Sequence, residues 1–86
     1  MKLSAFNDLI CQTHNVFEEC QQKFYDADKA WRECYTDYDH YTDCDRAAKQ
    51  LVKDIHFHRQ DTVFFALNSL ILAKDILEKL GYIEED

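Results

Sequence analysis

The sequence contains one glycine and no proline in 86 residues. Tight strand turns depend on these residues, and phosphate-binding loops depend on glycine, so their scarcity argues against an all-β fold and a nucleotide-binding fold. The longest unbroken apolar run, Val63 to Leu67, is far shorter than the roughly 20 residues that span a bilayer, and no signal-like apolar core follows Met1. We therefore expect a cytoplasmic protein that neither enters a membrane nor is exported.

Basic residues are also scarce, with 10 Lys and Arg against 17 Asp and Glu, for a net charge of −7. The imbalance is strongest in residues 26–45, which hold seven acidic and two basic side chains. Such a surplus repels nucleic acid and favours a basic partner. We expect that the chain does not bind nucleic acid directly. We expect instead a protein partner with a basic surface.

Motifs that carry catalysis are missing. The sequence has no Gly-x-Ser-x-Gly and no His-Glu-x-x-His, and Asp37-x-x-His40 lacks the second copy that a di-iron helical bundle requires. We expect no enzyme activity, no catalytic residue and no cofactor or metal.

Apolar residues recur in steps of three and four through the first two thirds of the chain. The positions in this ladder are Leu3, Phe6, Ile10, Thr13, Phe17, Cys20, Phe24, Ala27, Trp31, Cys34, Tyr38, Tyr41, Asp45, Ala48, Val52 and Ile55. This period is typical of a helix packed against another helix, and Ser4 or Asn7 is suited to cap its start. One helix over residues 4–58 would be about 80 Å long and would persist only within an assembly.

Two segments favour an interruption of this ladder. Residues 35–42 replace good helix formers with Thr, Asp, Tyr and His, and Asp45 takes a ladder position that a core would not choose. Thr42 followed by Asp45 resembles the capping start of a helix over residues 47–55. A weaker candidate for the break is residues 26–28.

A further helix is predicted after a second boundary. The basic stretch of residues 53–59 suits a helix C-terminus, Asp61 is suited to cap a new helix that begins at Thr62, and Gly81 is suited to end it. The hydrophobic Tyr82 fits a glycine C-cap whose following residue folds back on the last turn.

This last helix is apolar around most of its circumference, so most of it must be covered. A chain of this length buries only about 60–65% of its unfolded surface, and a second copy is the simplest cover. The predicted oligomer interface consists of Phe64, Phe65, Leu67, Ile71, Leu72 and Ile76. The sequence thus predicts an all-α protein with a single helical domain over residues 1–86. It comprises a long N-terminal helix or helical hairpin plus a C-terminal hydrophobic helix, assembled as a dimeric helical bundle or a larger oligomer.

The four cysteines at positions 11, 20, 34 and 44 invite a comparison. Cys34 and Cys44 are separated by nine residues, and in this respect the chain resembles the twin Cx9C helical hairpins of the mitochondrial intermembrane space. The resemblance covers residues 11–44 and implies a hairpin that turns near Ala27, with Cys20 paired to Cys34 and Cys11 paired to Cys44. Cys11 and Cys20 depart from the family spacing, and the other interpretation is four reduced cysteines that pack as small apolar side chains.

The same imagined hairpin suggests a zinc site. Cys11-x-x-His14 and His40-x-x-x-Cys44 each place two ligands on one helical face, which together make a Cys2His2 set. Zinc ligation would turn the apolar ladder away from its partner helix, because Cys11 lies off that ladder. His56 and His58 are two residues apart and thus on opposite helical faces, so they are interpreted as solvated or directed toward the helix dipole and not as a metal pair.

Tyrosines and aspartates alternate near the middle of the chain. We call this set the acidic aromatic band, and its members are Tyr35, Asp37, Tyr38, Asp39, Tyr41, Asp43 and Asp45. If the band were helical, its charges would be about 4 Å apart, close to the spacing of phosphates along a DNA strand. The band is therefore interpreted as a solvated acidic face, a partner-binding surface or a mimic of nucleic acid.

The function predicted by these features is that of a small acidic protein that binds and regulates or inhibits another macromolecule. Phage and mobile-element inhibitors of host nucleic-acid-binding complexes share this description, and the hypothesis rests on that class-level similarity. The alternative is a disulfide-stapled scaffold or assembly protein resembling the twin Cx9C family.

Overall fold

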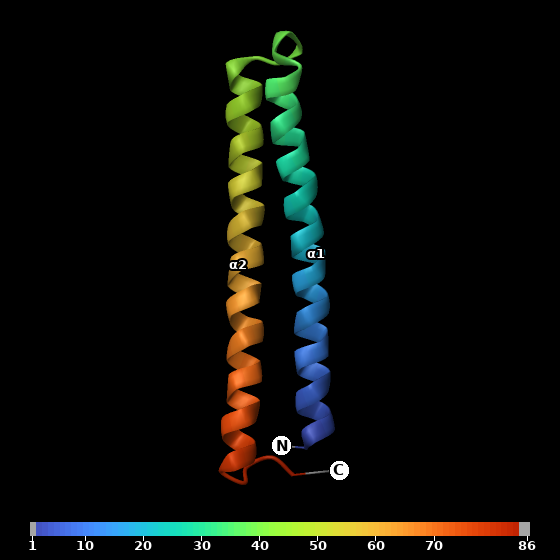
Figure 1. The fold of residues 1–86 in the computed structure, drawn as a ribbon, viewed down its shortest axis with the longest axis vertical. Helices are drawn as coiled ribbons and strands as arrows, with labels where there is room; N and C mark the ends of the chain where they lie inside the picture. The colour runs from blue at the N-terminus through green and yellow to red at the C-terminus, as the bar shows by residue number, and fades with distance from the viewer. Residues whose placement is uncertain (1, 85–86) are drawn as a thin grey trace.

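The computed structural model describes residues 2–84 and shows two long antiparallel helices that form a hairpin (Figure 1). Helix α1 spans Leu3–Thr36, the short 3-10 helix η1 spans Tyr38–His40, and helix α2 spans Asp43–Lys79. The hairpin measures 62 × 16 × 14 Å. The predicted all-α class and helical hairpin are confirmed. Within residues 2–84, neither helix has a stretch long and apolar enough to cross a bilayer.

The helix break lies where residues 35–42 predicted it, at the η1 turn. The weaker candidate at residues 26–28 is wrong, because α1 continues through it. Its two aspartates serve helix-surface pairs instead: Gln22 donates to Asp26 over 3.0 Å, and Arg32 lies 3.0 Å from Asp28. Both pairs span one helical turn and favour the helix.

The two ends of the chain meet at the open end of the hairpin. The Leu3 amide donates to the Glu84 carbonyl over 2.8 Å, and the Lys2 ammonium lies 3.0 Å from the Glu84 carboxylate. Lys2 is the N-cap residue, so the expectation that Ser4 or Asn7 begins the helix is wrong. A backbone carbonyl from the C-terminal segment thus satisfies one of the first amides of α1, which have no partner within the helix.

Gly81 ends α2 as predicted. It has φ 79°, a conformation that L side chains rarely adopt. The Gly81 amide donates to Glu78 over 3.1 Å and the Tyr82 amide donates to Leu77 over 2.9 Å, which satisfies two terminal carbonyls. This pair of hydrogen bonds is a Schellman motif.

The second predicted boundary is wrong, because α2 is continuous from Asp43 to Lys79. Asp61 does not cap a new helix, and the Thr62 hydroxyl bonds back to the His58 carbonyl over 2.9 Å within the same helix. No glycine or proline interrupts this stretch, so nothing forces a break. The predicted C-terminal hydrophobic helix is therefore the second half of α2.

The apolar ladder holds for the whole of α1. Phe6, Cys20, Ala27 and Cys34 are buried against α2, and the ladder residues between them are half-buried. Each lies three or four residues from the next, as expected for a seam between two helices. Helix α1 therefore contributes a regular stripe to the hairpin core.

In α2 the ladder fails, because the inward stripe lies one or two positions later than predicted. Asp45, Ala48, Val52 and Ile55 are exposed. The residues that face α1 instead include Arg46, Gln50, Lys53, His56, Gln60, Val63, Leu67, Leu70, Lys74 and Leu77. The turn resets the phase of the helix, so a ladder cannot be counted across it.

The two halves of the hairpin are held together differently. Near the turn, Lys53 lies 3.7 Å from the centre of the Trp31 ring and 3.1 Å from the Asp28 carboxylate. Nearer the chain termini, the rings of Phe17 and Phe64 lie 5.6 Å apart. A cation over an aromatic face and an ion pair thus stabilise the half near the turn, and apolar packing stabilises the half near the chain termini.

In the half near the chain termini, Leu67 is the large side chain of α2 that is buried, with 7% exposure. We expect Leu67→Ala to lower the free energy of unfolding by about 2–5 kcal/mol, because it deletes buried methyl groups and leaves a cavity. Leu80→Ala is the matched control, since Leu80 is 64% exposed. Urea unfolding followed by circular dichroism measures both, and equal losses would contradict the assigned seam.

Candidate functional site

The acidic aromatic band lies at the closed end of the hairpin, which we call the tip. Tyr35 is in the last turn of α1, Tyr38 and Asp39 are in η1, and Asp43 and Asp45 are in the first turn of α2. The band is therefore a turn with two flanking helix ends and not a single helix. The even charge spacing on which mimicry of nucleic acid depended is not present.

Arg46 holds the residues of the tip together. Among residues 2–84 it is the charged residue that is buried, with 7% exposure. Its guanidinium donates to the Asp43 carboxylate over 2.7 Å and to the Tyr41 carbonyl over 3.0 Å. A longer bond of 3.4 Å reaches the Tyr38 carbonyl. The rigid fork of donors on arginine suits this task, because it joins three points of the turn at once.

Two tyrosine rings complete the surroundings of Arg46. The guanidinium carbon lies 3.8 Å from the centre of the Tyr38 ring and 6.0 Å from that of Tyr35. The hydrogen bond to Asp43 is the main cause that raises the pKa of Arg46 above its ordinary value. Both rings remain about half exposed, so each has one side held by arginine and another open to solvent.

Thr42 and Asp45 form the predicted capping box at the start of α2. The Thr42 hydroxyl accepts from the Asp45 amide over 3.1 Å, and the Thr42 amide donates to the Asp45 carboxylate over 2.9 Å. The backbone hydrogen bond from Thr42 is the main cause that lowers the pKa of Asp45 below its ordinary value. Asp45 is thus occupied with starting the helix.

The remaining aspartates differ in how far they are engaged. Asp37 lies 2.9 Å from the His40 ring, and Asp43 holds Arg46 while 93% of its own side chain stays exposed. Asp39 is exposed on η1. Asp37, Asp39 and Asp43 therefore present negative charge to solvent, and Asp45 serves mainly the fold.

Sequence reasoning did not single out Arg46. The signal for it was the spacing of Asp43 and Arg46, three residues apart, which places both side chains on one helical face. The residue that shapes the tip thus lies just outside the band that the composition defined.

The predicted cysteine pairings are wrong. Cys20 and Cys34 both lie in α1, about 21 Å apart along the helix, and the hairpin turns at η1 and not near Ala27. Cys11 lies toward the chain termini, whereas Cys44 lies beside the tip, and all four thiols are free. The stapled hairpin implied by the twin Cx9C resemblance does not form.

The suggested zinc ligands do not come together either. Cys11 and His14 lie in the first half of α1, whereas His40 and Cys44 are at the tip. Over residues 2–84, no group of three or more Cys, His, Asp or Glu side chains is arranged to hold a metal ion. The Cys2His2 hypothesis is therefore wrong.

The residues of the predicted oligomer interface divide between two faces of α2. Phe65, Leu72 and Ile76 are exposed, whereas Leu67 is buried against α1. Phe64 is partly occupied by its contact with the Phe17 ring, and Ile71 is 49% exposed. Leu67 is thus not available to a second copy.

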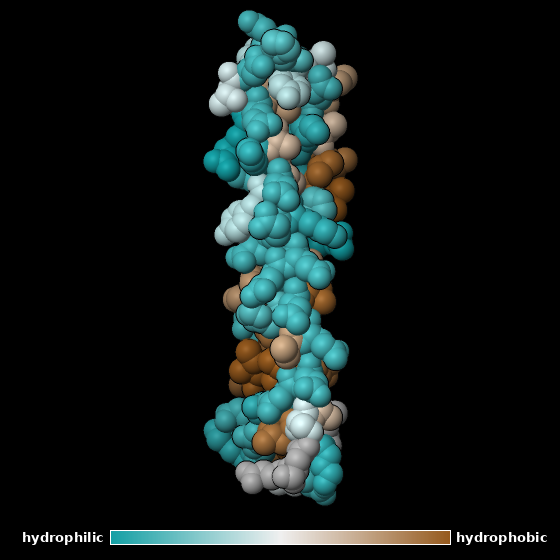
Figure 2. Space-filling model, turned by 90° about the vertical axis from the view of Figure 1, so that its right-hand side faces the viewer, coloured by the Kyte–Doolittle hydropathy of each residue, from teal (hydrophilic) through white to brown (hydrophobic). Residues whose placement is uncertain are grey.

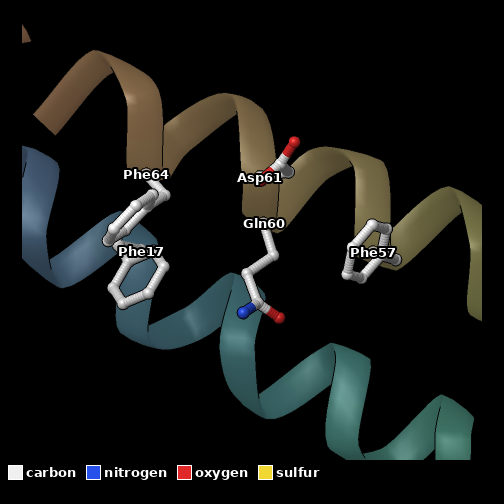
Figure 3. A pocket seen from close by; sticks show the side chains of 5 residues that line it. All are labelled: Phe17, Phe57, Gln60, Asp61 and Phe64. Atoms are coloured by element: carbon white, nitrogen blue, oxygen red, sulfur yellow. The ribbon is translucent and has the colours of Figure 1, made fainter. Parts of the chain in front are cut away.

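A shallow hollow of about 180 Å³ lies between the helices (Figure 3). Its lining residues are Phe17, Phe57, Gln60, Asp61 and Phe64. The Gln60 side chain points toward α1 while Asp61 points away from it, and the Gln60 carbonyl oxygen is buried without a hydrogen bond. One amide among phenyl rings offers neither a nucleophile nor an acid–base pair, so this hollow has no evident catalytic chemistry.

Comparison with protein-family models, with curated proteins and with solved structures finds no match to this chain.

The capping box gives a pH-dependent prediction. Because the pKa of Asp45 is lowered in the folded state, its stabilising contribution is complete at neutral pH and is lost as the pH falls through that lowered value. We expect Asp45→Asn to melt at a lower temperature than the unmodified protein at about pH 7, and the difference to narrow steadily as the pH is lowered below 3.8, the ordinary pKa of this carboxyl. Thermal unfolding followed by circular dichroism measures this, with Asp39→Asn as the control. A difference that does not narrow on acidification would contradict the role of the carboxylate.

Proposed function

We propose that this protein is a non-catalytic binding protein whose tip docks on a basic surface of a protein partner and regulates or inhibits it. The proposal rests on the contacts of the buried Arg46 guanidinium with the half-exposed rings of Tyr35 and Tyr38. Exposed aspartate carboxylates surround these two rings. Tyrosines held in place bring large contact area at little entropic cost, and the carboxylates favour a basic partner.

The partner that we propose is a nucleic-acid-binding complex of a host cell, and the protein would be a phage or mobile-element product. A protein that binds nucleic acid offers the basic surface that the acidic tip requires. We also propose a cytoplasmic location, which the four free thiols support. Self-association belongs to the same proposal, because α2 leaves large apolar side chains exposed.

The tip is tested by capture from the native host with the partner identified by mass spectrometry, followed by titration of the purified partner. We expect Asp37→Asn/Asp39→Asn to weaken binding by roughly 10-fold, and binding by the unmodified protein to weaken as salt is raised. These two aspartates are chosen because Asp45 and Asp43 support the fold.

The matched control is Asp8→Asn/Glu19→Gln, which makes the same change in charge at exposed positions of α1 away from the tip. This control should bind as tightly as the unmodified protein. Equal affinity for the tip variant and the control would refute the tip as the docking surface.

A further inference from the structure

The face of α2 opposite the hairpin core carries a second regular stripe, which we call the outer stripe. Its large members are Leu51, Ile55, Phe65, Leu72 and Ile76, each between 47% and 63% exposed. His58, Thr62 and Ser69 fill the gaps, so that the stripe advances in alternating steps of four and three from residue 51 to residue 76. That alternation is the heptad pattern of a helix packed along a second helix.

The other helix shows no such pattern on its solvent face. Seen from the side of α1, the molecule is mostly hydrophilic, with separate apolar patches at the upper right and in the lower part of the view (Figure 2). Helix α1 therefore has one apolar seam, and α2 has two. A helix with apolar residues on opposite faces is covered on both, so the missing neighbour belongs on α2.

The exposed area matches what a second copy would cover. The accessible surface is 6322 Å², whereas a folded monomer of this mass, 10.3 kDa, exposes about 5,400 Å². The excess of about 900 Å² is close to the roughly 800 Å² that each partner loses in a protein interface of standard size. The excess comes from the elongated shape of the hairpin, and one further copy packed along α2 would cover about this much.

The outer stripe is also complementary to itself when two copies run antiparallel. Pairing Leu51 with the Ile76 position of the second copy places Ile55 against Leu72, which are two apolar layers. The same register places His58 against Ser69, a polar layer nearer the centre, and Thr62 against Phe65. Since the register is two-fold symmetric, each of these layers occurs twice, as an isologous interface requires.

Charge favours the same orientation. Two acidic tips would lie side by side in a parallel pair, whereas an antiparallel pair separates them by most of the 62 Å length of the hairpin. Asp54 and Asp75 flank the stripe and would face each other in the antiparallel pair. The Lys79 ammonium lies 2.9 Å from Asp75 and offsets its charge, whereas Asp54 accepts a hydrogen bond from the neutral Gln50 amide over 3.0 Å and keeps its charge.

We infer that the outer stripe of α2 binds the outer stripe of a second copy of this chain in antiparallel orientation, which makes a dimer of hairpins with one acidic tip at each end. This inference rests on the self-association proposed above and specifies its surface. A dimer of this shape presents two tips that point in opposite directions, so it can engage two basic sites at once.

The surface is tested by sedimentation equilibrium of the full chain at micromolar concentration. We expect the unmodified protein to have twice the mass of the 10.3 kDa chain. Phe65→Glu/Leu72→Glu should weaken the dimer by roughly 100-fold or more while circular dichroism shows the helices intact. Tyr25→Glu is the control, because Tyr25 is 55% exposed on α1 and should leave the dimer unchanged.

Two outcomes are distinguishable. A monomeric unmodified protein would overturn both the self-association and its surface. A dimer unaffected by Phe65→Glu/Leu72→Glu would overturn the outer stripe alone and leave self-association standing.

Orientation is tested by oxidation in a Cys11→Ser/Cys44→Ser background, which removes the two exposed thiols. In the inferred register, His58→Cys/Ser69→Cys should give a disulfide-linked dimer, whereas His58→Cys or Ser69→Cys alone should not. Cross-linking by each single variant would show a parallel pair and overturn the antiparallel arrangement. A dimer in which neither the single nor the double variants cross-link would overturn the surface itself.

Discussion

A hairpin of two helices can bury only one stripe of each helix, and this limit governs the rest of the molecule. With no third element to pack against, every apolar residue outside the two facing stripes stays in contact with solvent. Helix α1 nearly meets the limit, because most of its apolar residues fall on the seam from Leu3 to Cys34. Its exposed large side chains are Leu9, Val16, Tyr25 and Tyr35, which form no regular stripe. Helix α2 has more apolar side chains than one stripe can bury, and the large ones that remain exposed favour contact with a second copy.

The inward face of α2 explains why so much apolar surface is left over. Its first half meets α1 with Arg46, Gln50, Lys53 and Gln60, which are polar or charged. Lys53 is accommodated by the Trp31 ring and the Asp28 carboxylate, and Arg46 by the turn. Polar groups brought into a seam need such partners, and here each cation has both a carboxylate and an aromatic face.

The turn and the proposed interfaces depend on one another through Arg46. By joining the backbone of the turn to the start of α2, this residue holds Tyr35 and Tyr38 at the surface and sets which face of α2 meets α1. The same contacts therefore define the tip and direct the outer stripe away from the hairpin. A binding surface at the end and an assembly surface along the side can coexist, because they share no exposed residue.

The parts of the structure that could be predicted from the sequence are local. The capping box of Thr42 and Asp45 and the glycine end at Gly81 involve residues within one or two turns of each other, so their spacing is sufficient to recognise them. The break at residues 35–42 was predicted for the same reason. The Arg46 cluster was missed because its aromatic and carbonyl partners lie in the last turn of α1 and in the turn itself, and no spacing rule relates those residues to one in α2.

The sequence by itself determined that the chain is helical and which stripe of α1 is apolar, because propensity, capping and periodicity act within a single helix. It favoured a break at residues 35–42, but it also offered breaks at residues 26–28 and before Thr62, so it did not determine where the hairpin turns. Only the tertiary structure decided which stripe of α2 faces α1. The prediction that the ladder continues through Asp45, Val52 and Ile55 is wrong, because a turn allows the second helix to rotate about its own axis. The contacts of Arg46 and Lys53 fit only the rotation that is observed. An apolar residue on α2 could thus belong to the hairpin core, as Leu67 does, or to the outside, as Phe65 does, and the packing of the two helices settled which.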